Sequence, residues 1–150
     1  MVSCASALFI YILLSSIAYC LTFATSMALL IAYRFKAGRI YAFFSDMFLK
    51  SAIALLVIYA GFAIAVRLFS WMPYGCPLWM MSYFFHNNTL SMIALLFGAT
   101  SIVLYFLIAQ SYHLEHRRWV PLVLISNIIA HAARLGVSYI ISALFERFTL

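Results

Sequence analysis

Residues 2–33 read VSCASALFIYILLSSIAYCLTFATSMALLIAY, and no charged side chain occurs among them. A helix needs about 20 mainly apolar residues to cross the hydrocarbon layer of a membrane, at a rise of about 1.5 Å per residue. Because this stretch is longer than one crossing needs, we expect its helix to be tilted or to project at its N-terminal end. A cleaved signal peptide is not expected, because no basic segment precedes the apolar residues.

The rest of the chain has the same character. Apolar residues make up 68% of its 150 residues, charged residues only 8%, and the mean hydropathy is +1.11. Soluble domains average roughly 45–50% apolar and about 25% charged residues. The composition therefore predicts an integral membrane protein. Its net charge of +6 indicates contacts with anionic lipids, and no nucleic-acid partner is expected.

Three further apolar stretches predict three further helices. We expect an all-α, polytopic protein with one transmembrane domain, 1–150, and short loops. Its predicted spans are 5–33, 43–68, 89–112 and 119–145. In the second span, Asp46 and Lys50 are four residues apart and are expected to pair, while Lys50 and Arg67 extend to opposite membrane surfaces. Pro121 is expected in the first turn of the fourth span, where proline is tolerated.

The segment from Trp71 to Asn88 combines turn-forming residues with many aromatic ones. An exposed loop would not normally be so aromatic. We expect this loop to lie in the membrane interface or to form a docking surface for another subunit. Its principal residues are Trp71, Trp79, Tyr83, Phe84 and Phe85.

Lysine and arginine counts predict the orientation. One side of the membrane would hold six of them: Arg34, Lys36, Arg39, Lys50, Arg117 and Arg118. The other side would hold Arg67 and Arg147. The positive-inside rule then places the first and third loops in the cytoplasm or matrix. Both termini and the aromatic loop would face the periplasm or intermembrane space, in a bacterial or organellar inner membrane.

A polar stripe interrupts the fourth span. It comprises Asn127, His131, Arg134 and Ser138, whose spacing of four, three and four places them on one helix face. An arginine near mid-span costs roughly 2.5–3.5 kcal/mol on insertion scales, so Arg134 is expected to face protein, water or an anion. The stripe is interpreted as a hydrogen-bonded seam between helices or subunits, or alternatively as a polar path or ligand site.

The chain has only three acidic residues: Asp46, Glu115 and Glu146. None is predicted at the depth of Arg134, which favours a counter-charge from outside the chain. The histidines do not pair at matched depth, so no cofactor or metal is predicted; His131 could still supply one haem ligand at a subunit interface. Cys4, Cys20 and Cys76 form no C-x-x-C motif. Bound lipids are expected.

No nucleophile–base pair, phosphate loop or carboxylate pair is evident, so the chain is not expected to be an enzyme on its own. The leading hypothesis is a non-catalytic, structural or assembly subunit of a larger membrane complex, of the energy-transducing or secretion type. Its partners would be other integral membrane subunits. An alternative is a small self-associating pore or carrier, holin-like or lipid-translocating. A third hypothesis is a redox membrane anchor that binds haem or quinone.

Overall fold

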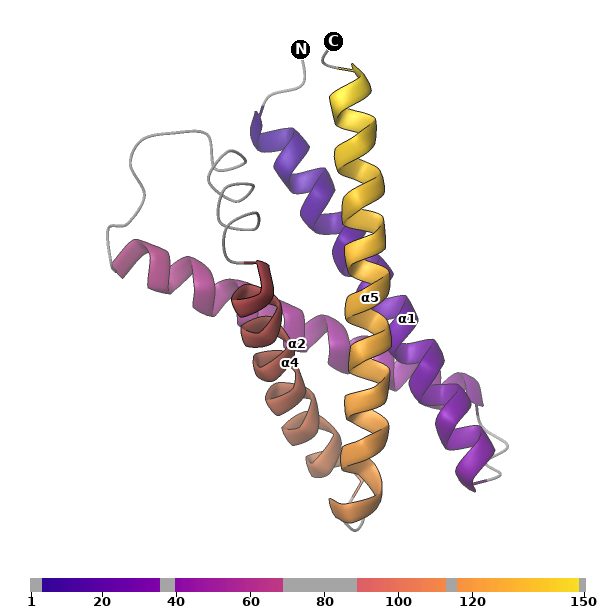
Figure 1. Cartoon of the computed structure of the whole chain (residues 1–150). Helices are drawn as coiled ribbons and strands as arrows, with labels where there is room; N and C mark the ends of the chain where they lie inside the picture. Colours follow the sequence, from indigo (N-terminus) through magenta and orange to yellow (C-terminus); the bar gives the residue numbers. More distant parts are fainter. Residues whose placement is uncertain (1–3, 36–39, 69–88, 113–115, 149–150) are drawn as a thin grey trace.

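The structure is a computed structural model that describes residues 4–35, 40–68, 89–112 and 116–148. They form four helices: α1 (Cys4–Phe35), α2 (Ile40–Leu68), α4 (Thr89–Ser111) and α5 (His116–Phe148) (Figure 1). The prediction of an all-helical chain is confirmed, and each of the four helices is long and apolar enough to cross a membrane. The helix ends differ from those of the predicted spans by at most three residues.

One local prediction is wrong. Because α5 begins at His116, Pro121 lies inside the helix, in its second turn. Proline has no N–H group, so the main-chain hydrogen bond from position 121 to the carbonyl group of residue 117 is missing. The helix continues through this position, since only that one bond is lost near its beginning.

Each of the four helices packs against two of the others. α1 packs against α2 and α5, and α4 packs against the same two helices. Figure 1 shows α2 crossing the other three helices obliquely. The end of α1, the start of α2, the end of α4 and the start of α5 lie toward one end of the molecule, which we call the basic end. The first turn of α1 and the last turn of α5 lie at the opposite end.

The core is centred on one face of α1. Tyr19, Phe23, Met27 and Ile31 are at most 2% exposed, and their spacing of four residues aligns them in one ridge along the helix. Buried side chains from the other three helices complete this core: Met47, Leu55, Leu104, Ile108, Leu122 and Val123.

The outer faces of the helices are apolar as well. Leu56, Phe106 and Ile140 are each more than half exposed. The helices are buried to different extents. In the most apolar part of α5, 39% is buried inside the protein, but in that of α4 only 17% is buried. Within the described residues, α4 therefore leaves most of its apolar surface open to contacts from outside the chain.

Candidate functional site: a buried polar seam

Asn127 lies at the centre of a hydrogen-bond network that joins α1, α4 and α5. Its side chain is fully buried. Its Oδ1 atom accepts a hydrogen bond from Tyr19 Oη at 2.5 Å, and its Nδ2 atom donates to Ser101 Oγ at 2.7 Å. The Nδ2 atom also lies 3.0 Å from Thr100 Oγ1 and 3.2 Å from the carbonyl oxygen of Phe97. One side-chain amide thus connects three helices, as polar residues commonly do between apolar helices.

His131 joins this network one turn further along α5. Its Nε2 atom lies 3.0 Å from Thr100 Oγ1. The Thr100 hydroxyl also lies within hydrogen-bond distance of the carbonyl oxygens of Leu96, at 2.8 Å, and Phe97, at 3.1 Å. The ring of Tyr19 packs against that of His131, with centroids 4.9 Å apart.

We call these five residues the polar seam: Tyr19, Thr100, Ser101, Asn127 and His131. Its side-chain polar groups form hydrogen bonds with one another between the helices. A buried network of this kind fixes how helices are rotated relative to one another, because any other rotation would leave polar groups unpaired.

Arg134 lies on the same buried face of α5, three residues beyond His131. It is only 9% exposed, and its Nη1 atom has no hydrogen-bond partner among the described residues. The guanidinium carbon Cζ lies 5.8 Å from the centre of the Tyr59 ring on α2, which is a cation–π contact. That contact attracts the charge but satisfies none of the N–H groups. Arg134 is therefore incompletely compensated within the described chain.

Asp46, the acidic residue whose side chain the structure describes, does not supply the missing partner. It is bonded to Lys50 and Tyr112 instead.

The remaining predicted site residues are placed as follows. Ser138 is half-buried on α5 and takes no part in the seam. Arg34 lies near the end of α1, and Arg117 and Arg118 lie near the start of α5, all toward the basic end. The positions outside the described residues are Lys36, Arg39 and the whole aromatic loop, with Trp71, Trp79, Tyr83, Phe84 and Phe85.

A second polar cluster lies near the basic end. The predicted ion pair of Asp46 with Lys50 is present. Tyr112 donates its hydroxyl proton to Oδ2 of the same carboxylate at 2.7 Å. The Tyr112 ring stacks on Phe43, with centroids 5.6 Å apart, and on Trp119 at 5.5 Å. We call this group the helix-end cluster: Phe43, Asp46, Lys50, Tyr112 and Trp119. It joins α2 to Tyr112, which follows α4, and to Trp119 in α5.

The expectation that Lys50 extends to the membrane surface is wrong. Its side chain is 10% exposed, and its Nζ atom lies 5.3 Å above the centre of the Tyr112 ring. The carboxylate and the ring face satisfy the ammonium group, so it does not need water. Tyr112 lies one residue beyond α4. Burial raises the pKa of its phenol, and the Asp46 carboxylate acts in the same direction because a phenolate would be a second anion beside it.

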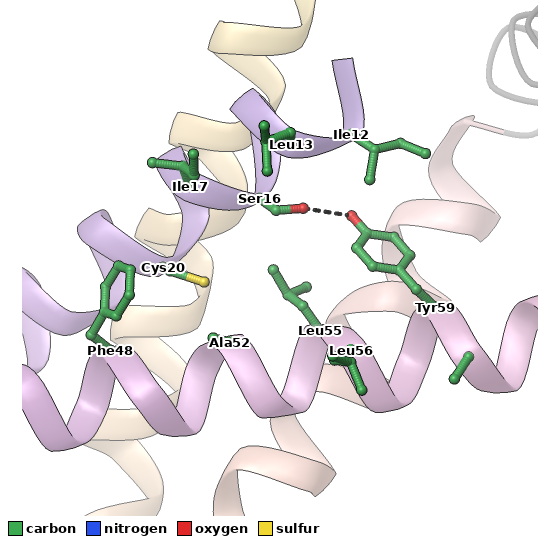
Figure 2. A pocket seen from close by; sticks show the side chains of 11 residues that line it. Ile12, Leu13, Ser16, Ile17, Cys20, Phe48, Ala52, Leu55, Leu56 and Tyr59 are labelled. Carbon is green, nitrogen blue, oxygen red and sulfur yellow. Dashed lines mark hydrogen bonds between the residues drawn. The ribbon is translucent and has the colours of Figure 1, made fainter. Parts of the chain in front are cut away.

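A groove of about 550 Å³ separates α1 from α2. Its walls are almost entirely apolar, formed by residues such as Ile12, Leu13, Leu55 and Leu56. Two hydroxyl groups face each other across it, Ser16 Oγ and Tyr59 Oη, at 3.3 Å (Figure 2). The groove is open to the surface of the helix pair.

Several contributors to these sites could not be found by sequence reasoning. The stripe on α5 was visible from its spacing, but its partners Tyr19 and Thr100 lie in helices whose scattered serine, threonine and tyrosine residues do not mark one face. Tyr59 and Tyr112 carry no local motif either. The one signal available was a hydroxyl group at mid-helix, since such a group needs a partner when it is buried.

No protein-family model, curated protein or solved structure matches this chain significantly. The fold of the described residues defines the class: a helical protein in which these residues form four helices long and apolar enough to cross a membrane. Function is therefore inferred from the residues of this chain alone.

Proposed function

We propose that the chain is an integral membrane protein that acts as a non-catalytic subunit of a larger membrane assembly. Its four apolar helices and its exposed apolar faces support insertion, because only a lipid or protein environment covers such surfaces favourably. Its basic end would face the cytoplasm or matrix, and the opposite end the periplasm or intermembrane space.

The observation that carries the subunit role is the uncompensated Arg134. A charge removed from water is costly unless it is paired, and breaking a buried pair typically costs about 3–5 kcal/mol. The described residues offer Arg134 a ring face and no carboxylate. A carboxylate on a membrane helix of another subunit is the group that reaches this depth. Nη1 is enclosed by atoms of this chain, so the surrounding helices would have to shift as the partner helix docks for that carboxylate to reach it.

The packing of α4 is in accord with this role. Its most apolar window is the least buried of the four, so a neighbouring helix has room to cover it. The polar seam supports a structural role too, because its side-chain polar groups are used in hydrogen bonds between helices. A pore or carrier would instead keep polar side chains free to line a path.

Purification of tagged protein in a mild detergent tests the proposal. We expect a different membrane protein to co-purify in fixed stoichiometry and to carry an aspartate or glutamate within a transmembrane helix. Replacing that acid by leucine should release the chain. A homo-oligomer alone would favour the pore or carrier, and a Soret absorption band would favour the redox anchor; either result would contradict the subunit role.

A further inference from the structure

We propose that the groove between α1 and α2 binds the head of an isoprenoid quinone, with Tyr59 donating a hydrogen bond to one of its carbonyl oxygens. This inference rests on the membrane insertion proposed above, but it does not require a partner subunit. It concerns a surface that the polar seam does not use.

The shape and lining of the groove fit a lipophilic ligand. Its volume of about 550 Å³ lies within the usual range for small-molecule sites, about 300–1,000 Å³. Phe48 and Tyr59 contribute aromatic walls, and Leu55 and Ile17 contribute aliphatic ones. Figure 2 shows Phe48, Leu55 and Tyr59 pointing from α2 toward α1. Because the groove is open, a long isoprenoid tail can leave it toward the surrounding lipid.

The hydroxyl pair supplies the polar contact. When two hydroxyl groups bond to each other, one proton is used and the other remains free to donate. A phenol is a stronger hydrogen-bond donor than an aliphatic alcohol, so with a ligand present Tyr59 would donate to it and Ser16 would donate to the Tyr59 oxygen. A carbonyl oxygen, which only accepts, complements this arrangement.

Depth decides which carbonyl compound fits. Ser16 lies eleven residues inside the predicted first span, which begins at residue 5, so it is about 16 Å along the helix. Arg134 lies eleven residues before residue 145, the end of the predicted fourth span, which is also about 16 Å along α5. The ester carbonyls of phospholipids stay at the boundary of the hydrocarbon layer, close to their headgroups. A quinone has no headgroup, so its carbonyls can enter the layer to this depth.

Photolabelling of the full chain in lipid nanodiscs tests the assignment. An azido-ubiquinone should label peptides of α1 or α2, and decylubiquinone should compete while oleic acid does not. Tyr59→Phe should weaken competition by decylubiquinone about 3- to 10-fold, as expected for one lost hydrogen bond. Ser16→Ala should change it less than about 3-fold, because Tyr59 keeps its proton. Tyr139→Phe is the matched control, since Tyr139 is 78% exposed on α5.

Three results would overturn the inference: labelling outside α1 and α2, competition by oleic acid as strong as that by decylubiquinone, or unchanged affinity in Tyr59→Phe. Ala52→Trp, which fills the groove without touching the hydroxyl pair, should abolish labelling, and full labelling of it would also contradict the site. Resistance of the chain to alkaline extraction from membranes is measured in parallel. If the chain stays in the membrane but is not labelled, the quinone site fails while the proposed insertion stands.

Discussion

The hydroxyl group of Tyr19 on α1 donates a 2.5 Å hydrogen bond to Oδ1 of Asn127 on α5, across 108 positions of the chain. Both side chains are fully buried, so neither can exchange this partner for water. The bond fixes the rotation of α1 against α5, because turning either helix would leave two polar groups unpaired.

Asn127→Ala should lower the free energy of unfolding by about 1–3 kcal/mol. A single hydrogen bond between membrane helices contributes on average about 0.6 and at most about 1.7 kcal/mol, and this substitution removes several. Steric trapping or titration with a denaturing detergent measures the change. Ser126→Ala is the matched control: Ser126 is the preceding residue and is equally buried, but its Oγ atom has no partner among the described residues. Equal losses in both variants would contradict the role of Asn127.

Arg134→Leu should leave insertion intact or improve it, because leucine is favoured in the bilayer and a mid-span arginine costs roughly 2.5–3.5 kcal/mol. It should nevertheless reduce the recovery of co-purifying subunits about tenfold or more, since the partner's carboxylate would be left unpaired. Arg134→Lys should restore recovery only in part, because lysine lacks the planar fork of guanidinium. Ser138→Ala, on the same helix, should behave like the parent. The subunit role would be refuted by an Arg134→Leu variant that assembles normally.

Tyr112→Phe should lower the free energy of unfolding by about 1 kcal/mol near neutral pH, through loss of the hydrogen bond to Asp46. In the folded parent, the pKa of the Tyr112 phenol is raised above the ordinary value of about 10. Below pH 10 the phenol is protonated in both states, so its contribution is complete. Above pH 10 the unfolded chain loses the proton first, so the stability falls as the pH rises.

The parent should therefore lose stability more steeply above pH 10 than Tyr112→Phe does. Unfolding curves at a series of alkaline pH values give the two slopes. Tyr41→Phe serves as the control, because it also removes one phenol hydroxyl group but at a residue that is 90% exposed. Parallel slopes for the parent and Tyr112→Phe would show that the helix-end cluster does not depend on the protonated phenol.

Single cysteines test the orientation. In a variant that lacks Cys4, Cys20 and Cys76, a cysteine at Gly38 should be protected from a membrane-impermeant reagent added outside, and a cysteine at Gly75 should react. The six-to-two distribution of basic residues is the reason. The reverse pattern of labelling would mean that the topology is inverted.

The four helices were predictable because long stretches without charges can be recognised from the sequence itself. The stripe on α5 was predictable too, since Asn127, His131 and Arg134 follow the helical period. Its partners were not. α1 and α4 are apolar on all sides, so no local pattern marks the face on which Tyr19 or Thr100 lies. Which faces meet depends on how whole helices pack, and a single sequence does not reveal that.

Lys50 illustrates a different limit. From the sequence, a lysine near a helix end is expected to extend to the membrane surface. The structure holds it at Asp46, its predicted partner, and above the ring of Tyr112, which comes from a distant part of the chain. The sequence indicates the Asp46 partner, which is four residues away, but it does not indicate the Tyr112 ring. With only the ion pair known, the Lys50 ammonium group was expected at the membrane surface.

The polar seam also bears on how the protein is made. Tyr19 and Thr100 precede Asn127 in the chain, so they are synthesised before the amide that connects them. Until α5 arrives, the Tyr19 hydroxyl has no Asn127 oxygen to bind, while Thr100 can still bond to the Leu96 carbonyl in its own helix. Synthesis of α5 thus supplies the group that completes the seam. A chain that ends before residue 127 would lack the amide oxygen to which Tyr19 donates.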